Sequence, residues 1–215
     1  MADDLKYGYK GAEPTQSFGN NTGVFDPNDI NNLIADNKWT SFGQLELIET
    51  QTVSAVANVT FTNLGDYNVH FITYNDMLIG TDNQTLAIQV SYDGGTSFRT
   101  STNDYQYALQ WGRADGTFFE SRDTTSAYIP IGLSIGNNTN ERGNGYVYLY
   151  NMLDSTKYSF STYQCSHTGD TTLSVMNFGS SVCDIAEVHN AFKVYNLGAT
   201  SQLTGTISLY GIRYS

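Results

Sequence analysis

The chain has 215 residues, a length that suits one domain of sandwich size with an extension. It carries 10 Lys and Arg against 21 Asp and Glu, so the formal net charge is −11 and no basic stripe is available to bind nucleic acid. Only 14% of residues are charged while 13% are aromatic, and no run approaches the ~18 apolar residues of a membrane span, so no membrane insertion is expected.

Residues 1–43 are interpreted as an N-terminal anchoring arm, because Gly and Asn interrupt them and no hydrophobic period runs through them. One short helix is predicted around Asp26–Ala35, with Asp26 as N-cap and Pro27 at the first helical position. So short a helix is not stable alone in water, so the arm is expected to dock on a partner. The candidate partner-binding residues are its aromatic and apolar anchors, Tyr7, Tyr9, Phe18, Phe25, Ile30, Leu33 and Trp39.

From residue 44 onward the pattern is that of β-strands. Apolar residues alternate with polar or small ones, which is typical of strands that pack on a core from one side. Turn signals separate the predicted strands, and one of them, Asp93-Gly94-Gly95, is interpreted as a hairpin. The long gaps between some strands favour a jelly-roll path. The predicted fold class is therefore all-β, a jelly-roll-like antiparallel β-sandwich over residues 44–215. Ten strands are predicted, near residues 45–53, 58–61, 69–74, 86–92, 105–111, 129–135, 146–150, 158–165, 192–195 and 203–209.

The sequence lacks the usual catalytic motifs, including a Gly-x-Ser-x-Gly elbow and a phosphate-binding loop. His70, His167 and His189 share no metal-ligand spacing. Cys165 and His167 lie two residues apart and would share one face of a strand, but no carboxylate is placed to orient a thiol–imidazole pair. Cys165 and Cys183 are expected to be buried free thiols. We therefore predict a non-enzymatic protein with no catalytic residue, no metal site and no cofactor.

The segment from Tyr146 to Tyr150 is apolar on both faces. Tyr146, Tyr148 and Tyr150 alternate with Val147 and Leu149. Exposed tyrosines would suit stacking on sugar rings. A strand apolar on both faces is better explained as a buried central strand or as a subunit interface.

Four segments together resemble one kind of structural module. The run Leu45–Val53 followed by Val59–Phe61 looks like its opening strands, the Ser91–Phe98 segment is similar to its strand–Asp-Gly-Gly–strand element, and Leu203–Ile212 resembles its closing strand. That module is a β-sandwich common in bacteriophage structural proteins, and Asn21–Phe25 with the helix after it is similar to segments that precede such modules in marine phage tail proteins. The resemblance implies a virion component that is usually a homotrimer, and it carries no catalytic residues.

These inferences lead to one functional hypothesis and two alternatives. The acidic start Met1–Asp4 lacks the apolar core of a signal peptide, so synthesis in the host cytoplasm and assembly into the virion are expected. The first hypothesis is a tail-associated or tail-fibre-type module, bound to other virion proteins through its arm and facing a host-surface glycan. The alternative is a capsid decoration (cement) protein that forms trimers on the head. A further alternative is a carbohydrate-binding module.

Overall fold

A computed structural model describes residues 27–35, 45–169, 172–198 and 202–212 of the chain. Its helix, α1 (Pro27–Ala35), begins at the proline predicted for the first helical position, and none of its residues is buried. The predicted N-cap, Asp26, lies outside the described residues. The helix and the β-sandwich belong to two separate compact units. The first strand begins at Leu45, and the division of the chain into an arm and a sandwich after residue 43 stays a prediction.

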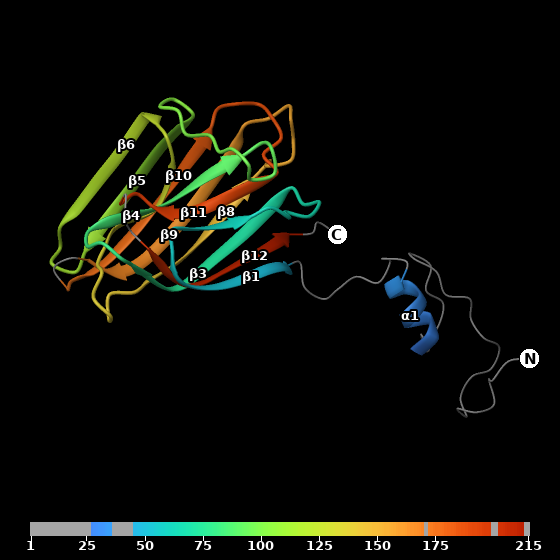
Figure 1. Cartoon of the computed structure of the whole chain (residues 1–215), viewed down its shortest axis with the longest axis horizontal. Coiled ribbons are helices and arrows are strands. Elements are labelled where there is room, and N and C mark those ends of the chain that lie inside the picture. The colour runs from blue at the N-terminus through green and yellow to red at the C-terminus, as the bar shows by residue number, and fades with distance from the viewer. Residues whose placement is uncertain (1–26, 36–44, 170–171, 199–201, 213–215) are drawn as a thin grey trace, which may run out of the picture. The chain divides into compact units, whose positions relative to one another are not determined.

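The larger sheet has eight strands, and every neighbouring pair in it is antiparallel (Figure 1). β1 and β6 form its two edges. In spatial order the strands are β1 (Leu45–Val56), β12 (Leu203–Ile212), β3 (Val69–Ile79), β8 (Gly143–Tyr150), β9 (Ser159–Thr168), β10 (Ser174–Cys183), β5 (Tyr105–Arg113) and β6 (Phe118–Ser126).

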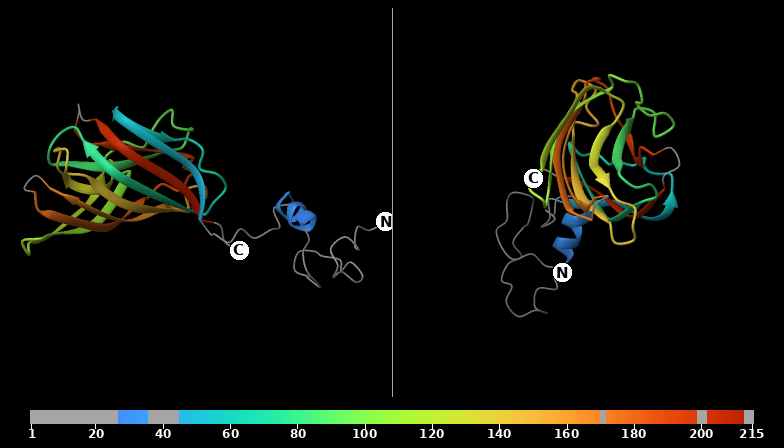
Figure 2. Two further views of the ribbon diagram at one scale, coloured as in Figure 1. Left: turned by 90° about the horizontal axis from the view of Figure 1, so that it is seen from below. Right: turned by 90° about the vertical axis from the view of Figure 1, so that its left-hand side faces the viewer.

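The smaller sheet has four antiparallel strands and packs on the larger one (Figure 2). Its edge strand β7 contacts β8, β9, β10 and β5, while β2 at the other edge contacts β1. The predicted all-β sandwich is confirmed. In spatial order the strands are β2 (Asn58–Phe61), β11 (Ala191–Asn196), β4 (Gln84–Ser91) and β7 (Ile129–Ile135).

The chain path explains why the two sheets differ in width. When β5, β6, β9 and β10 are left aside, two four-stranded sheets remain, with the orders β1-β12-β3-β8 and β2-β11-β4-β7. Along these eight strands the chain passes to the other sheet at every connection except the one from β4 to β7. We interpret this path as the predicted jelly roll with two hairpins, β5–β6 and β9–β10, added to one sheet. The added strands form the half of the larger sheet that ends at β6.

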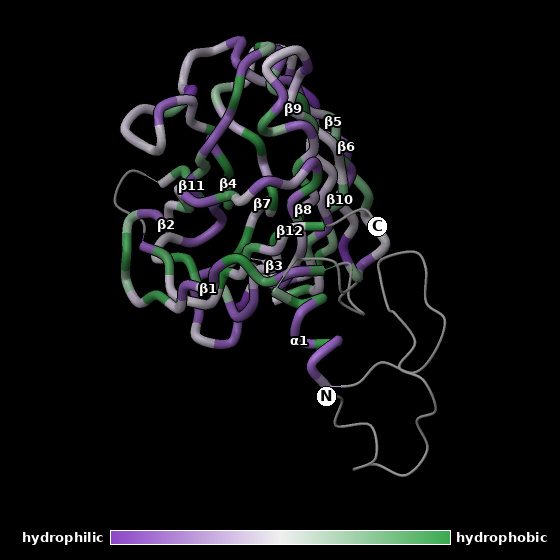
Figure 3. The backbone as a smooth tube through the Cα atoms, turned by 90° about the vertical axis from the view of Figure 1, so that its right-hand side faces the viewer, coloured by the Kyte–Doolittle hydropathy of each residue, from purple (hydrophilic) through white to green (hydrophobic). Residues whose placement is uncertain are grey.

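Alternate residues of both sheets meet between the layers and form one hydrophobic core. Hydrophobic positions recur along the strands of both sheets, as Figure 3 shows. Phe61 of β2 and Phe192 of β11 are cross-strand neighbours, and their rings stack with centroids 5.0 Å apart. Fully buried Tyr74 donates its hydroxyl to the carbonyl of Ile131 at 2.6 Å, so its polar atom is satisfied. Each such large side chain contributes about 1.5–3 kcal/mol by leaving water.

Two predictions about local structure are wrong. About ten strands were expected and the described residues form twelve; β6 and β10 were missed because they carry few large apolar side chains on their inner face. The segment with Asp93-Gly94-Gly95 is not a β-hairpin, because β4 ends at Ser91 and the next strand, β5, belongs to the other sheet. It is a tight turn in which Gly94 and Gly95 adopt φ of 74° and 89°, a conformation that favours glycine.

Candidate functional site

The outer face of the larger sheet, turned away from the smaller sheet, carries a cluster of aromatic side chains. Val147 and Leu149 of β8 are buried in the core, so Tyr146, Tyr148 and Tyr150 project from the opposite face. Neighbouring rings along the strand contact each other, with centroids 5.9 Å apart for Tyr146–Tyr148 and 6.2 Å for Tyr148–Tyr150. The strand β8 is central in its sheet as expected, but the expectation that it is buried on both faces is wrong, because Tyr146 is 37% exposed; the alternative of a subunit interface stays a prediction.

Rings on the neighbouring strands extend this cluster. Tyr210 of β12, Phe71 of β3 and Tyr148 of β8 are successive cross-strand neighbours. The Phe71 ring lies 4.7 Å from that of Tyr148 and 6.1 Å from that of Tyr210, centroid to centroid. Such contacts stabilise the arrangement by about 0.5–1.5 kcal/mol per pair beyond area burial. We call Phe71, Tyr146, Tyr148, Tyr150 and Tyr210 the aromatic cluster.

Beside the aromatic cluster, the outer face is hollowed across β8, β9, β10, β5 and β6. The hollow has a volume of about 690 Å³, within the range of about 300–1,000 Å³ typical of ligand sites. It crosses five strands, which corresponds to a length of about 19 Å at the usual strand spacing. Its lining comprises Ala108, Leu109, Gln110, Glu120, Ser121, Arg122, Tyr146, Tyr148, Thr162, Tyr163, Gln164, Met176, Phe178, Gly179 and Ser180.

A row of long side chains crosses the hollow. Strand register places Tyr146, Gln164, Phe178, Gln110 and Glu120 in line, one from each of the five strands. Rings therefore alternate with amides, and a carboxylate ends the row. The Tyr146 hydroxyl donates to Oε1 of Gln164 at 2.9 Å, which orients both side chains. Phe178 is 43% exposed, so the row presents apolar surface to solvent.

A parallel row of short side chains explains why this surface is hollow. Tyr148, Thr162, Ser180, Ala108 and Arg122 are the next cross-strand set on the same face. The three central members are small, so the surface drops between the large residues at either end and the long row beside it. Arg122 Nη1 lies 2.6 Å from Glu120 Oε1, and both side chains are largely exposed. The charges inside the hollow are therefore balanced.

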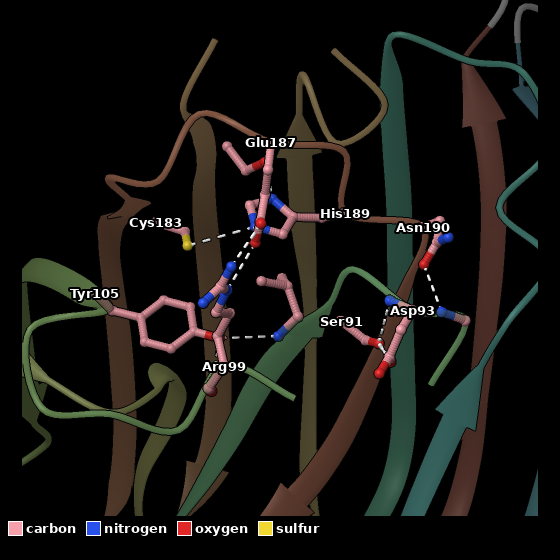
Figure 4. Close-up of polar contacts among 11 residues, drawn as sticks. Ser91, Asp93, Arg99, Tyr105, Cys183, Glu187, His189 and Asn190 are labelled. Atoms are coloured by element: carbon pink, nitrogen blue, oxygen red, sulfur yellow. Dashed lines mark hydrogen bonds and ion pairs between the residues drawn. The ribbon is translucent and has the colours of Figure 1, made fainter. Parts of the chain in front are cut away.

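A second cluster of polar residues lies around the loop between β10 and β11 (Figure 4). Glu187 accepts two hydrogen bonds from Arg99, at 2.7 and 2.5 Å, and its Oε1 lies 3.2 Å from His189 Nε2. Cys183 Sγ lies 3.7 Å from the same imidazole nitrogen, and Ser159 Oγ lies 2.7 Å from His189 Nδ1. A thiol, an imidazole and a carboxylate thus meet here, as they would in a cysteine nucleophile site.

The protonation states in this cluster oppose nucleophilic chemistry. Burial raises the pKa of Cys183 to about 12, so the thiol stays protonated near neutral pH. Burial also lowers the pKa of His189, although Glu187 beside it opposes part of that shift. The side chains of both residues are shielded from solvent. The cluster joins the loop to the sandwich and offers no accessible reactive atom.

The pair considered from the sequence, Cys165 and His167, does share the inner face of β9, but its members have different partners. Cys165 lies against Tyr74, and His167 Nε2 lies 3.5 Å from the side-chain amide nitrogen of Asn177. Burial raises the pKa of Cys165 to about 12 and lowers that of His167. The expectation of two buried free thiols is confirmed.

The arm residues predicted to bind a partner are only partly described. Ile30 and Leu33 are half-buried on α1. Within the described ranges, no cluster of His, Cys, Asp or Glu is arranged to bind a metal ion, and no helix there is long and apolar enough to cross a membrane. Outside the described residues lie Tyr7, Tyr9, Phe18, Phe25 and Trp39.

Sequence reasoning missed the hollow itself. Met176 and Phe178 alternate with small and polar residues in β10, and this alternation was the available signal. The amides and the Glu120–Arg122 pair gave no signal in the sequence, because strand pairing alone brings them together in the hollow. No family model matches this chain, and a comparison with curated proteins finds none with a similar sequence. The site is therefore interpreted from its own geometry.

Proposed function

We propose that this chain is a non-enzymatic structural protein of a bacteriophage virion, a tail-associated module that binds a surface through the outer face of its larger sheet. The observation that carries the binding role is the hollow beside the aromatic cluster. Rigid strands hold apolar rings and hydrogen-bonding groups at a solvent-facing site, which is the usual composition of a ligand surface. Isolated exposed apolar residues need no explanation, but a continuous set of them does.

The placement of reactive groups supports a binding role over a catalytic one. Both cysteines and all three histidines lie in the described part of the chain, and all five side chains are buried. The virion assignment is supported by the resemblance of Leu45–Val53 and Leu203–Ile212 to the opening and closing strands of phage sandwich modules. These two segments are paired neighbours, β1 and β12, at one edge of the sheet.

The virion assignment is tested on particles purified from the culture that produces this protein. Mass spectrometry gives the copy number relative to the major capsid protein, and a gold-labelled antibody gives the location by electron microscopy. We expect a low copy number and label at the tail. Absence of the protein from purified particles would overturn the virion assignment.

The capsid decoration alternative is favoured by a different observation. At the β1 edge, Leu45 and Leu47 are 46% and 57% exposed, and they lie opposite Ile212 and Tyr210 on β12. This apolar edge would become buried if sandwiches associate as a homotrimer on the head. Label over the capsid, with a copy number comparable to that of the capsid protein, would establish this alternative and exclude the tail location.

A further inference from the structure

We infer that the hollow across β8, β9, β10, β5 and β6 binds an uncharged glycan chain. This inference deepens the proposed function, because it names the chemical class of the surface that the sandwich recognises. Three properties of the hollow carry it: its shape, the order of its side chains and its balance of charge.

The shape suits a narrow, extended ligand. The hollow crosses the strands at right angles, and its floor is the row of short residues Thr162, Ser180 and Ala108. A length of about 19 Å accommodates several sugar units in succession. A two-fold contact centred on the hollow would place one hollow opposite the other and leave both unfilled.

The order of side chains matches the two kinds of surface that a sugar presents. One face of a pyranose ring carries C–H groups, which pack on exposed aromatic rings, and its edge carries hydroxyls. Tyr146 and Phe178 provide two rings, two strands apart, and Gln164 and Gln110 provide amides beside them. Tyr146 hydrogen-bonds the amide oxygen of Gln164, so the amide N–H groups remain as donors to a hydroxyl.

The charges favour an uncharged glycan over an acidic one. Arg122 is paired with Glu120 at 2.6 Å, so the cation in the hollow is already neutralised. The whole chain carries a formal net charge of −11, which repels a polyanion at long range. Binding by stacking and neutral hydrogen bonds should therefore depend little on salt.

The test uses the full-length protein and a matched pair of substitutions. Phe178→Ala removes the ring in the hollow, while Phe160→Ala removes a ring on the neighbouring strand of the same face that is not part of the lining. The two phenylalanines have similar exposure, 43% and 46%, so their effects on stability should be comparable. Binding is measured by calorimetry with neutral glucan, xylan and mannan oligosaccharides and with neutral host-cell polysaccharide. Alginate and hyaluronan oligosaccharides serve as acidic probes.

We expect at least one neutral probe to bind the wild type. Phe178→Ala should weaken that binding by about tenfold or more, and Phe160→Ala by less than about twofold. Thermal melts confirm that both variants fold. If the neutral host-cell polysaccharide binds and the defined oligosaccharides do not, the host cell surface is the source of the ligand.

Four results would overturn the inference. The first three are no binding of any neutral probe, an equal loss of affinity in the two variants, and preferential binding of the acidic probes. A fourth is sedimentation showing that Phe178→Ala dissociates an oligomer of the wild type, because a second copy would then occupy this face. The presence of the protein in particles is measured separately, so the glycan inference can fail while the virion assignment stands.

Discussion

Gly179 lies in the middle of β10, within the lining of the hollow, at a position with no space for a side chain. A Cβ there would lie 2.5 Å from the Cβ of Leu109 and 2.7 Å from the carbonyl oxygen of Ala108. The neighbouring backbone would have to shift. We therefore expect Gly179→Ala to lower the free energy of unfolding by about 1–3 kcal/mol, measured by urea denaturation.

The control for this substitution is Ser180→Ala, the next residue on the same strand. Its side chain faces solvent on the outer side, so the unfolding free energy should change by less than about 0.5 kcal/mol. Equal midpoints for wild type and Gly179→Ala would show that β5, β9 and β10 are packed more loosely than the structure indicates.

The two thiols give a second prediction at the residue scale. Cys165 and Cys183 are fully buried, and burial raises the pKa of each to about 12. At pH 8 the native protein should react with a thiol-specific chromogenic disulfide far more slowly than a small-molecule thiol. Both thiols should react at once when the protein is unfolded in guanidinium chloride. Under the same conditions a Cys165→Ser variant should release half as much chromophore as the wild type. Rapid reaction of the native protein would mean that the core opens readily at β9 or β10.

At the scale of elements, the arm should be dispensable for folding. Both sheets are complete within residues 45–212, and α1 buries none of its side chains. Deleting residues 1–42 should leave circular dichroism and the melting temperature of the sandwich nearly unchanged, while incorporation into particles is lost. A truncated chain that fails to fold would show that the arm contributes to the core. A folded, truncated chain that still joins particles would show that the arm is not the anchor.

Periodicity predicted the strands with one large apolar face and missed those without one. In β4, Leu86, Ile88 and Val90 alternate regularly with smaller or polar residues, so that strand was predictable. The inner residues of β10 include Asn177, Gly179 and Ser181, which carry no apolar signal. They are tolerated because neighbouring strands supply the large side chains. In β6, an edge strand, most residues are exposed and the pattern is polar throughout.

For the whole molecule, the buried histidines make stability depend on pH. Burial lowers the pKa of His70, His167 and His189 below the ordinary value of 6.5. The unfolded chain therefore binds protons that the folded protein excludes, so unfolding takes up protons. The free energy of unfolding should be highest above pH 6.5 and should fall as the pH drops below that value.

Urea midpoints at pH 7.5 and 5.5 measure this dependence. His70→Gln, which keeps a donor near the Leu64 carbonyl, should reduce the difference between the two midpoints. Carboxylates such as Glu187 have a lowered pKa, and they add a further loss only below pH 4.5, outside this window. Equal stability at both pH values would contradict the burial of the imidazoles.

The candidate site could not be predicted from the sequence, for a reason that belongs to the whole molecule. Periodicity identified Tyr146, Tyr148 and Tyr150 as one face of a strand. The neighbours of that face are set by long-range register. Gln110 and Tyr146 lie in one row although they are far apart in the chain, and β9 and β10 separate them in the sheet. The sequence predicts which residues face outward but not which strands lie side by side.

The stack of Trp111 on Phe119, with centroids 4.1 Å apart, gives the sandwich an internal fluorescent reporter. The chain has two tryptophans, Trp39 and Trp111, and removing residues 1–42 leaves only the second. Its emission then comes from the junction of β5 with the edge strand β6, beside two residues that line the hollow, Gln110 and Glu120. Detachment of β6 would separate the indole from its stacking partner and shift the emission to longer wavelength. This optical signal would therefore report opening of the β6 edge from the core side of the sheet, the side opposite the hollow.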